Sequence, residues 1–171
     1  MIYFLSLGSN IGDRKRNLAR ARRLLAKNGV AVLKASSVYR TEPVDVSDQP
    51  WFYNQTLEVR TGRTPFELLA LAKSIEAALG RVPTVKKGPR TIDIDILLAE
   101  DTVLKTPQLT IPHPRLAVRN FVLVPLNEIA PRAVHPVLRK SIHGLNQSCP
   151  DRSVVLMTGR RGQGRKRGST P

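Results

Sequence analysis

The sequence has few of the residues that crosslink a chain, bind zinc through sulfur or cross a membrane. Its one cysteine, Cys149, excludes an internal disulfide and a cysteine-based zinc site, which fits a reducing compartment. No run of about 18 apolar residues is present, so we expect no membrane-spanning helix. The N-terminus lacks a charged segment and a cleavage site, so no signal peptide is predicted. These absences favour a cytoplasmic protein.

Acidic residues are scarce beside basic ones. The 171 residues contain 28 Lys and Arg against 13 Asp and Glu, a net charge of +15. Residues 158–171 contribute five of the basic residues and no acid, so residues 1–157 keep a net charge of +10. We expect a single domain over 1–157 followed by a disordered basic tail over 158–171. A basic body attracts anionic partners, which include nucleotide phosphates, nucleic acid and membrane surfaces.

The hydrophobic pattern predicts alternating strands and helices. One helix should begin after Asp13 and end at Asn28-Gly29, and another should begin at Thr64-Pro65-Phe66-Glu67 and end at Gly80. Strands are predicted over residues 2–7, 30–39, 52–60 and 92–98. The order strand, helix, strand, strand, helix, strand is that of an α+β, ferredoxin-like sandwich.

The remaining segments are shorter and give weaker signals. Residues 101–104 and 109–111 are expected to form a small hairpin, and 141–147 a short helix. Residues 154–157 could add a strand. The apolar segment 121–130 is compatible with either a helix or a strand.

The strand predicted over 92–98 carries an unusual pattern. Side chains alternate between the two faces of a strand, so Asp93 and Asp95 should share one face, with Ile92, Ile94 and Ile96 on the other. Aspartate is rare in strands, and a break in a local rule is typical of a functional site. The alternative is an edge strand whose charges discourage aggregation.

Basic residues precede the two aspartates in one short loop. These residues are Arg81, Lys86, Lys87 and Arg90. Carboxylates that converge on one cation, with arginines beside them, are suited to binding magnesium and a polyphosphate. We therefore interpret this segment as a phosphate-transfer site, although a solvated basic turn is the alternative.

Two other segments could bind a ligand. Three of the eight aromatic residues occur together in Trp51-Phe52-Tyr53, Asn54 follows them, and Thr41 and Glu42 stand upstream. Aromatic faces stack on flat heterocycles and an Asn amide can pair with an N–C–N edge, but these residues could equally plug the core at a strand entrance. His113 lies between two prolines, close to Thr110, Arg115 and Arg119, where it could donate to a phosphate oxygen.

Five blocks of the sequence occur in an order that identifies a family. They are Leu7-Gly8-Ser9-Asn10; Ser37-Val38-Tyr39-Arg40-Thr41; Asp48-Gln49-Pro50 through Asn54; Gly88-Pro89-Arg90-Thr91-Ile92-Asp93-Ile94-Asp95-Ile96-Leu97; and Pro112-His113-Pro114-Arg115 with Phe121-Val122-Leu123-Val124-Pro125-Leu126. Together they resemble the 6-hydroxymethyl-7,8-dihydropterin pyrophosphokinases of folate biosynthesis. The block with the two aspartates is the most specific of the five.

This resemblance implies an α-β-α sandwich with a central antiparallel sheet and a role for each matching position. It implies transfer of the β,γ-diphosphate of ATP to the hydroxymethyl group of the pterin, with release of AMP. It implies that two Mg²⁺ ions are bound by Asp93 and Asp95, and that the phosphates are met during transfer by Arg81 and Arg90. ATP would be held by Glu76, Ile96, Thr110, His113 and Arg119. The pterin would be held by Thr41, Val44, Phe52, Asn54 and Phe121, with its ring between the two phenylalanines.

Three positions depart from the family pattern. Lys87 stands where a Trp often precedes the Gly-Pro-Arg turn, Gln108 where some members have an Arg, and Lys73 where some have a Gln. The residue that closes the loop over the site is therefore left open. The tail over 158–171 has no counterpart in the family pattern.

The rival interpretation is an RNA-binding ferredoxin-like module. The charge and the order of elements permit it, but the chain lacks the Lys/Arg-Gly-Phe type of strand motif whose aromatics stack on bases. A strand with two acids would also repel a phosphate backbone in the absence of metal. We therefore expect ATP and the pterin as partners, no membrane, no specific nucleic acid, and a monomer.

Overall fold

The computed structural model describes residues 1–44, 48–82 and 88–159. Its main sheet has the strand order β5-β1-β4-β3-β8, with β2 also paired to β4, and these strand pairs are antiparallel. The six strands are β1 (Ile2–Ser9), β2 (Ala31–Ala35), β3 (Tyr39–Thr41), β4 (Phe52–Arg60), β5 (Asp93–Ala99) and β8 (Val155–Met157). The segment over 154–157, for which a strand was one of two possibilities, forms β8 at one edge of the sheet.

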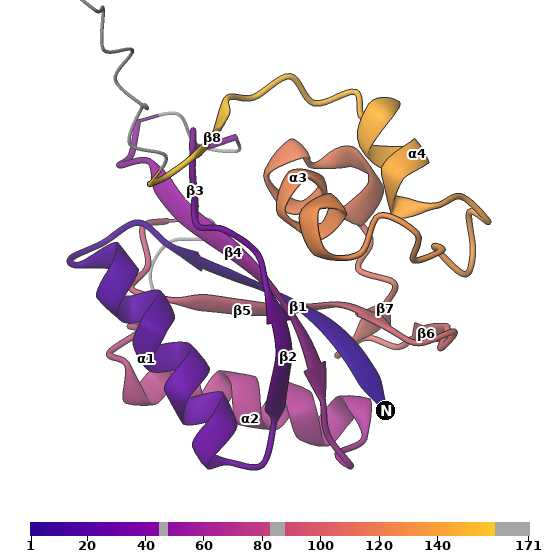
Figure 1. Ribbon diagram of the computed structural model, residues 1–171. Helices are drawn as coiled ribbons and strands as arrows, with labels where there is room; N and C mark the ends of the chain where they lie inside the picture. Colours follow the sequence, from indigo (N-terminus) through magenta and orange to yellow (C-terminus); the bar gives the residue numbers. More distant parts are fainter. Residues whose placement is uncertain (45–47, 83–87, 160–171) are drawn as a thin grey trace, which may run out of the picture.

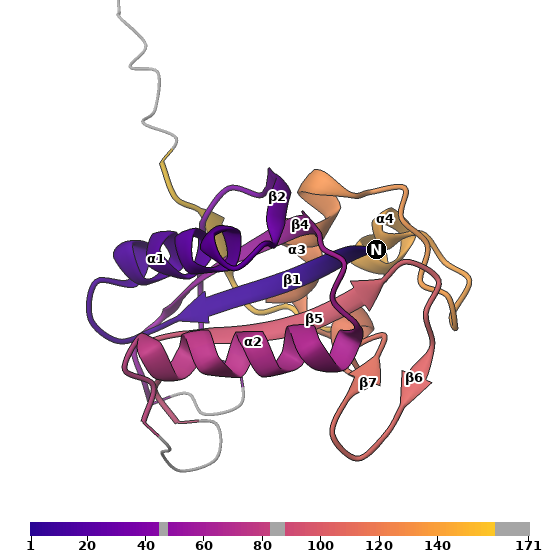
Figure 2. The ribbon, with the colours of Figure 1, turned by 90° about the horizontal axis from the view of Figure 1, so that it is seen from below.

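Helices cover both faces of this sheet (Figures 1 and 2). One face carries α1 (Arg14–Lys27) and α2 (Pro65–Ala78). The other carries α3 (Asn120–Ile129) and α4 (Ile142–Gln147), which follow a 3₁₀ turn over Leu116–Val118. This arrangement confirms the predicted α-β-α sandwich with a central antiparallel sheet.

The predicted helix starts have the capping contacts that their sequences indicate. The Asp13 side chain accepts from the Arg16 N–H at 3.0 Å, and the Thr64 N–H donates to Glu67 at 2.7 Å. Such caps satisfy N–H groups that have no partner within the helix, each worth about 1 kcal/mol. Local sequence therefore fixes where α1 and α2 begin.

The single strand predicted over 30–39 is wrong, because the chain forms two strands separated by Ser36, Ser37 and Val38. The Ser36 hydroxyl accepts from the Thr56 N–H at 2.9 Å, and the Ser37 N–H donates to Glu128 of α3 at 2.9 Å. These side-chain bonds replace ladder bonds, as serine and acidic side chains commonly do.

Two other predictions concern the region after β5. The predicted hairpin is confirmed as the pair β6 (Leu104–Lys105) and β7 (Thr110–Ile111). The segment over 121–130, which was compatible with helix or strand, is the helix α3, with Pro125 inside it. Its apolar residues pack against the sheet, and this packing decides between the two forms.

Two hydrophobic layers hold the sheet and leave one part of β5 open. Ile92, Ile94 and Ile96 are 0%, 0% and 3% exposed and lie in the layer beneath α1 and α2. A second layer under α3 and α4 includes Leu97, Leu98 and Leu123. The predicted two-faced character of the aspartate strand is therefore confirmed, and the rigid isoleucine face fixes where the carboxylates point.

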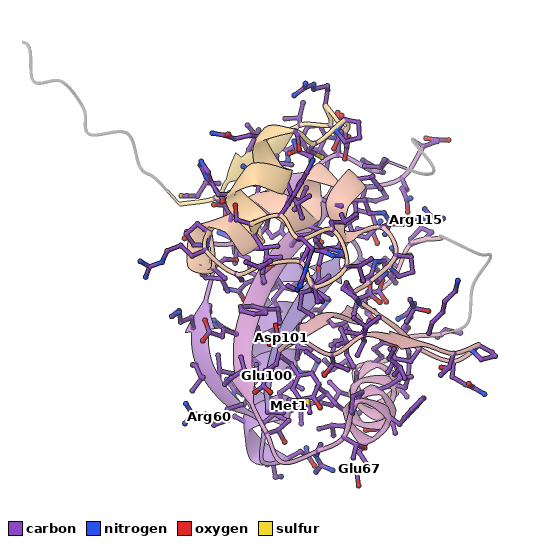
Figure 3. All side chains as sticks on the ribbon, turned by 90° about the vertical axis from the view of Figure 1, so that its right-hand side faces the viewer. Met1, Arg60, Glu67, Glu100, Asp101 and Arg115 are labelled. Atoms are coloured by element: carbon purple, nitrogen blue, oxygen red, sulfur yellow. The ribbon has the colours of Figure 1, made fainter. Side chains whose placement is uncertain are left out.

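One end of the sheet is held by hydrogen bonds from the first two residues of the chain. At one end the Ile2 N–H donates to Glu100 at 2.7 Å and the N-terminal amine donates to the Thr61 carbonyl at 3.0 Å. Figure 3 shows Met1, Arg60 and Glu100 gathered there, well apart from Arg115.

Part of the predicted organisation lies outside the described residues. This holds for Lys86, Lys87 and residues 160–171, so the boundary between the domain and its tail stays a prediction. Among the described residues, no helix combines the length and apolar character that crossing a bilayer requires.

Candidate active site

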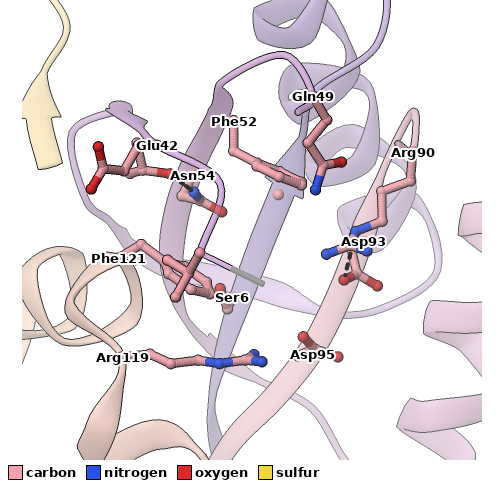
Figure 4. Close-up of a pocket in the computed structure, with 13 residues that line it drawn as sticks. Ser6, Glu42, Gln49, Phe52, Asn54, Arg90, Asp93, Asp95, Arg119 and Phe121 are labelled. Atoms are coloured by element: carbon pink, nitrogen blue, oxygen red, sulfur yellow. Dashed lines mark hydrogen bonds and ion pairs between the residues drawn. The ribbon is translucent and has the colours of Figure 1, made fainter. Parts of the chain in front are cut away.

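A pocket opens where the ends of β1, β4 and β5 meet the start of α3 (Figure 4). It brings together side chains from distant parts of the chain. Its lining consists of Ser6, Gly8, Thr41, Glu42, Val44, Gln49, Phe52, Asn54, Arg90, Asp93, Asp95, Arg119 and Phe121. The five residues predicted to hold the pterin are all present, together with both aspartates and two of the predicted arginines.

Strand register places the polar groups of this pocket side by side. β1 lies between β4 and β5, and in it Ser6 pairs with Asp95 while Gly8 pairs with Asp93 on one side and Asn54 on the other. A Cβ atom on Gly8 would lie 2.8 Å from Asn54 Oδ1, a separation too short for two non-bonded heavy atoms. Glycine at this position therefore lets the Asn54 amide approach the backbone of β1.

The two aspartates have different surroundings. Asp93 forms an ion pair with Arg81 at 2.6 Å and with Arg90 at 3.1 Å. Burial, and then the neighbouring Asp93 carboxylate, raise the pKa of Asp95 to about 6. A cation bound between the two carboxylates would relieve this repulsion, so the pair has the electrostatics of a metal site.

Glu76 of α2 forms a hydrogen bond to the backbone of the aspartate strand. Its side chain is buried, and it accepts the Ile94 N–H, which lies between the two aspartates, at 2.8 Å. It also forms ion pairs with Arg81 at 2.6 Å and with Lys73 at 3.1 Å. Lys73 and Arg81 thus balance the negative charge of Glu76.

The other half of the pocket has aromatic walls and an amide edge. Phe52 enters from β4 and Phe121 from α3, on either side of Asn54 (Figure 4). The Asn54 amide donates to Thr41 Oγ1 at 2.6 Å, and both residues are buried, which fixes the amide orientation. Flat walls and a fixed amide suit a planar heterocycle with an N–C–N edge.

Arginines face both phenylalanines at the border with the carboxylate half. The Arg90 guanidinium carbon lies 5.1 Å from the centre of the Phe52 ring, and that of Arg119 lies 5.4 Å from the Phe121 ring. Cation–π contacts of this length attract the guanidinium to the ring face. The two arginines therefore stand where a heterocycle and a polyphosphate would meet.

Five predicted residues are not part of the pocket lining. They are Glu76, Arg81, Ile96, Thr110 and His113. Arg81 adjoins the pocket through its ion pair with Asp93, and Glu76 adjoins it through its ion pair with Arg81. The Ile96 side chain is in the core beneath α1 and α2, so a contact between Ile96 and ATP would involve its main chain.

His113 is held in a fixed orientation beside β5. Its N–H donates to the Leu97 carbonyl at 2.9 Å, and its Nδ1 accepts from the Arg115 N–H at 3.1 Å. Burial, followed by the charges of Arg119 and Arg115, lowers the pKa of His113 to about 4. A neutral imidazole whose Nδ1 accepts carries its proton on Nε2, so His113 can donate from that atom.

Sequence reasoning missed Ser6 and Gln49 as pocket residues, whereas it grouped Glu42 with Thr41 and the aromatic cluster as residues that could hold a heterocycle. Ser6 and Gly8 are the two residues without large apolar side chains within 2–8, two positions apart, so they share a face of β1. That spacing was a usable signal. Gln49 lies in the block from Asp48 through Asn54, but its place in the pocket could not be predicted, because it depends on the Asn10 amide, which donates to Gln49 Oε1 at 3.0 Å.

The sequence pattern of the family described as 7,8-dihydro-6-hydroxymethylpterin-pyrophosphokinase (HPPK) matches residues 4–131. The chain belongs to the HPPK family. It is 50% identical over 129 residues to a 2-amino-4-hydroxy-6-hydroxymethyldihydropteridine pyrophosphokinase of Bacillus subtilis, a match that covers 75% of this chain and 77% of that protein. A protein of the same name from Methylorubrum extorquens is 48% identical over 132 residues, covering 77% and 84% of the two chains.

Other HPPK relatives are much longer than this chain. The folic acid synthesis protein fol1 of Schizosaccharomyces pombe is 42% identical over 156 residues, which is 91% of this chain but 21% of that protein. A solved structure of Plasmodium falciparum HPPK-DHPS has a TM-score of 0.68 at 19% identity and covers 86% of this chain and 45% of that one. At this identity the structure supports the shared fold.

Proposed function

We propose that this chain is the pyrophosphokinase of its family and transfers the β,γ-diphosphate of ATP to the hydroxymethyl group of 6-hydroxymethyl-7,8-dihydropterin, releasing AMP, in folate biosynthesis. The relatives named above carry this activity in their names. The observation that carries the proposal is that one pocket joins an aromatic, amide-edged half to a half with two carboxylates and two arginines. The first suits a pterin and the second suits a polyphosphate.

The acceptor half would hold the pterin ring by stacking and by its edge. Phe52 and Phe121 flank the ring, and the buried Asn54 amide, oriented by Thr41, pairs with the N–C–N edge. Val44 completes the apolar wall at the mouth of the pocket. This placement directs the hydroxymethyl group toward Arg90, Asp93 and Asp95, which lie across the pocket.

The carboxylate half fits magnesium together with ATP phosphates. Among the described residues, no group of three or more His, Cys, Asp or Glu side chains could hold a metal ion unaided. Magnesium in phosphate-transfer sites is usually held by one or two carboxylates plus the phosphates, so Asp93 and Asp95 are a sufficient protein contribution. When bound, two Mg²⁺ ions would neutralise phosphate charge and hold the reacting groups in line.

The chain's own residues would position the phosphates. The pterin hydroxymethyl oxygen attacks the β-phosphorus and its hydroxyl proton passes to water, while the bond between that phosphorus and its bridging oxygen to the α-phosphate breaks and AMP leaves with that oxygen. Arg81 and Arg90 stabilise the charge on the transferred group, and Arg119 with the Nε2 proton of neutral His113 holds ATP. Fixed donors of this kind cost little reorganisation during transfer.

Glu76 and Thr110 would then act from the border of the site. Glu76 holds the backbone between the two metal-binding aspartates and orients Arg81. Thr110 of β7, together with the main chain at Ile96, would contact the nucleotide beside His113. A cytoplasmic location and a monomeric state remain part of this proposal.

The RNA-binding alternative has no support among the relatives found. The pocket lining also contains two carboxylates whose charges would oppose a nucleic-acid backbone.

The decisive test is AMP formation from ATP, followed by chromatography. We expect AMP to appear only when the hydroxymethyl dihydropterin and Mg²⁺ are both present. ATP hydrolysis to ADP at an equal rate without the pterin would overturn the proposal. Replacing Arg16, an exposed residue of α1, with Ala is the matched control and should leave the rate unchanged.

A further inference from the structure

The first residues of α3 form one wall of the pocket, yet the helix does not cap itself. Asn120 is its first residue, with the pocket residues Arg119 and Phe121 on either side. The residue at the N-cap, Arg119, makes no capping bond with its side chain, and no acidic residue lies in the first turn. The N–H groups of a helix start need partners from elsewhere when the helix does not supply them.

A residue 31 positions later supplies this partner. Asp151 Oδ2 accepts the Asn120 N–H at 2.8 Å. The Asn120 side chain donates in return to the Ser153 carbonyl at 2.9 Å. The segment between α4 and β8 thus binds both the main chain and the side chain of the first residue of α3.

The Asp151 carboxylate is itself held in place. Its Oδ1 accepts the Ser153 N–H at 2.8 Å and its Oδ2 accepts the Ser153 hydroxyl at 3.0 Å. Partial burial alone would raise the pKa of Asp151, but the N–H groups of Ser153 and Asn120 outweigh burial and lower it. An ionised carboxylate at a helix start also interacts favourably with the helix dipole.

The same segment reaches the opposite wall of the pocket. The Val154 N–H donates to Glu42 Oε1 at 3.0 Å, and the Glu42 N–H donates to the Val154 carbonyl at 3.2 Å. In the ladder that follows, Val155 pairs with Thr41. Glu42 and Thr41 both line the pocket, so one short segment connects the wall made by α3 to the wall made by β3.

We propose that Asp151 is a positioning residue of the acceptor half, which keeps Phe121 opposite Phe52 at the separation that a heterocyclic ring requires. It acts through Asn120 and does not contact the ligand. The HPPK family match ends at residue 131, so Asp151 lies outside it. This inference rests on the proposed function in one respect only, the identity of the ring as a pterin.

The test compares three variants of the full chain. Asp151→Ala removes the cap, and Asp151→Asn keeps an oxygen that accepts from Asn120, because Asn caps helices about as well as Asp. Asp101→Ala is the control, since Asp101 is exposed in the turn after β5 (Figure 3). Calorimetry measures binding of 6-hydroxymethylpterin in the presence of Mg²⁺ and a non-hydrolysable ATP analogue, and then binding of the analogue alone.

We expect Asp151→Ala to weaken pterin binding about tenfold, the effect of a lost cap, and to raise the KM for the pterin equally. Binding of the ATP analogue should change by less than about twofold. Among the residues proposed to hold ATP, only Arg119 adjoins Asn120. Asp151→Asn and Asp101→Ala should stay within about twofold of the unmodified chain for both ligands. Amide exchange at Asn120 should accelerate in Asp151→Ala whether or not a ligand is present.

Three results would overturn the proposal. These are unchanged pterin binding in Asp151→Ala, an equal loss for both ligands with a matching fall in melting temperature, and an Asp151→Asn variant as impaired as Asp151→Ala. The last two comparisons separate positioning from a general loss of stability. If the unmodified chain bound no pterin while Asn120 exchange still responded to Asp151→Ala, the proposed function would fail and the capping role would stand.

Discussion

Arg81 Nη1 lies 2.6 Å from Asp93 Oδ1, so a residue expected to meet phosphates is bound to a carboxylate expected to bind magnesium. The same nitrogen lies 2.6 Å from Glu76 Oε2, and the other carboxylate oxygen of Glu76, Oε1, accepts the Ile94 N–H at 2.8 Å. Arg81 therefore neutralises Asp93 in the absence of ligands, and metal binding has to compete with this ion pair.

Arg81→Ala is therefore expected to change metal binding and catalysis in opposite directions. Removing the guanidinium frees Asp93 and lowers the local positive charge, so Mn²⁺, used as a spectroscopic substitute for Mg²⁺, should bind about three- to tenfold more tightly. The transfer rate should fall because the phosphates lose a cation. Electron paramagnetic resonance of free Mn²⁺ measures the first effect, with Arg16→Ala as control. Weaker Mn²⁺ binding in Arg81→Ala would contradict the competition.

Asp95→Asn should abolish transfer while stabilising the metal-free fold near neutral pH. The pKa of Asp95 is raised to about 6 from 3.8, so the folded state favours the protonated form. The stability that this gives is fully present below pH 3.8 and is lost as the pH rises through about 6. An uncharged Asn avoids the loss, so the melting temperature of the variant should exceed that of the unmodified chain at pH 7.5 and match it near pH 4. Thermal unfolding with a chelator present measures this, and equal melting temperatures at pH 7.5 would contradict it.

Gly8→Ala should displace the Asn54 amide. The added Cβ atom would lie 2.8 Å from Asn54 Oδ1, so the amide has to move from its position beside Thr41. Overpacking of this kind typically costs about 1–3 kcal/mol of unfolding free energy. We expect weaker pterin binding by calorimetry and a lower urea midpoint.

Gly62→Ala provides the matched control for that change. A Cβ atom on Gly62 would have no atom within 4 Å, so the same substitution is sterically allowed there. If both alanine variants bound the pterin as tightly as the unmodified chain, the close approach of Gly8 and Asn54 would not matter for binding.

His113 should remain neutral throughout the range in which most histidines titrate. Its pKa is lowered to about 4 from 6.5, so the stability linked to its neutral form is present above pH 6.5 and is lost as the pH falls toward 4. Its imidazole signals in nuclear magnetic resonance should stay constant from pH 8 to about 5. Urea unfolding at pH 7 and pH 4.5 should show a smaller loss in His113→Gln than in the unmodified chain. A His113 midpoint near 6.5 would contradict this prediction.

Much of the fold followed from local patterns. The alternation around Asp93 and Asp95 required no tertiary information, because a strand with one buried face fixes the direction of every second side chain. The starts of α1 and α2 were likewise encoded in four-residue capping sequences. The family resemblance then supplied residue roles that the strand pattern alone could not give.

What could not be predicted depends on contacts between distant segments. The break between β2 and β3 is produced by Glu128, which lies 91 residues after Ser37 and accepts its N–H and hydroxyl at 2.9 and 2.8 Å. The bond from Asn10 to Gln49 spans 39 residues, and the bond from Asn120 to Asp151 spans 31. No local propensity identifies such partners, because each depends on how two layers of the finished fold meet.

The position of β8 has a consequence for the order in which the protein acquires its two binding halves during synthesis. The carboxylate half is built by β1, α2 and β5, all of which precede residue 100, whereas the support for Phe121 comes from Asp151 and β8. A nascent chain that has emerged from the ribosome only as far as α4 already contains the groups proposed to bind the nucleotide. The contacts proposed to position the acceptor form only when the segment after α4 has followed, so we expect nucleotide binding to precede acceptor binding during synthesis.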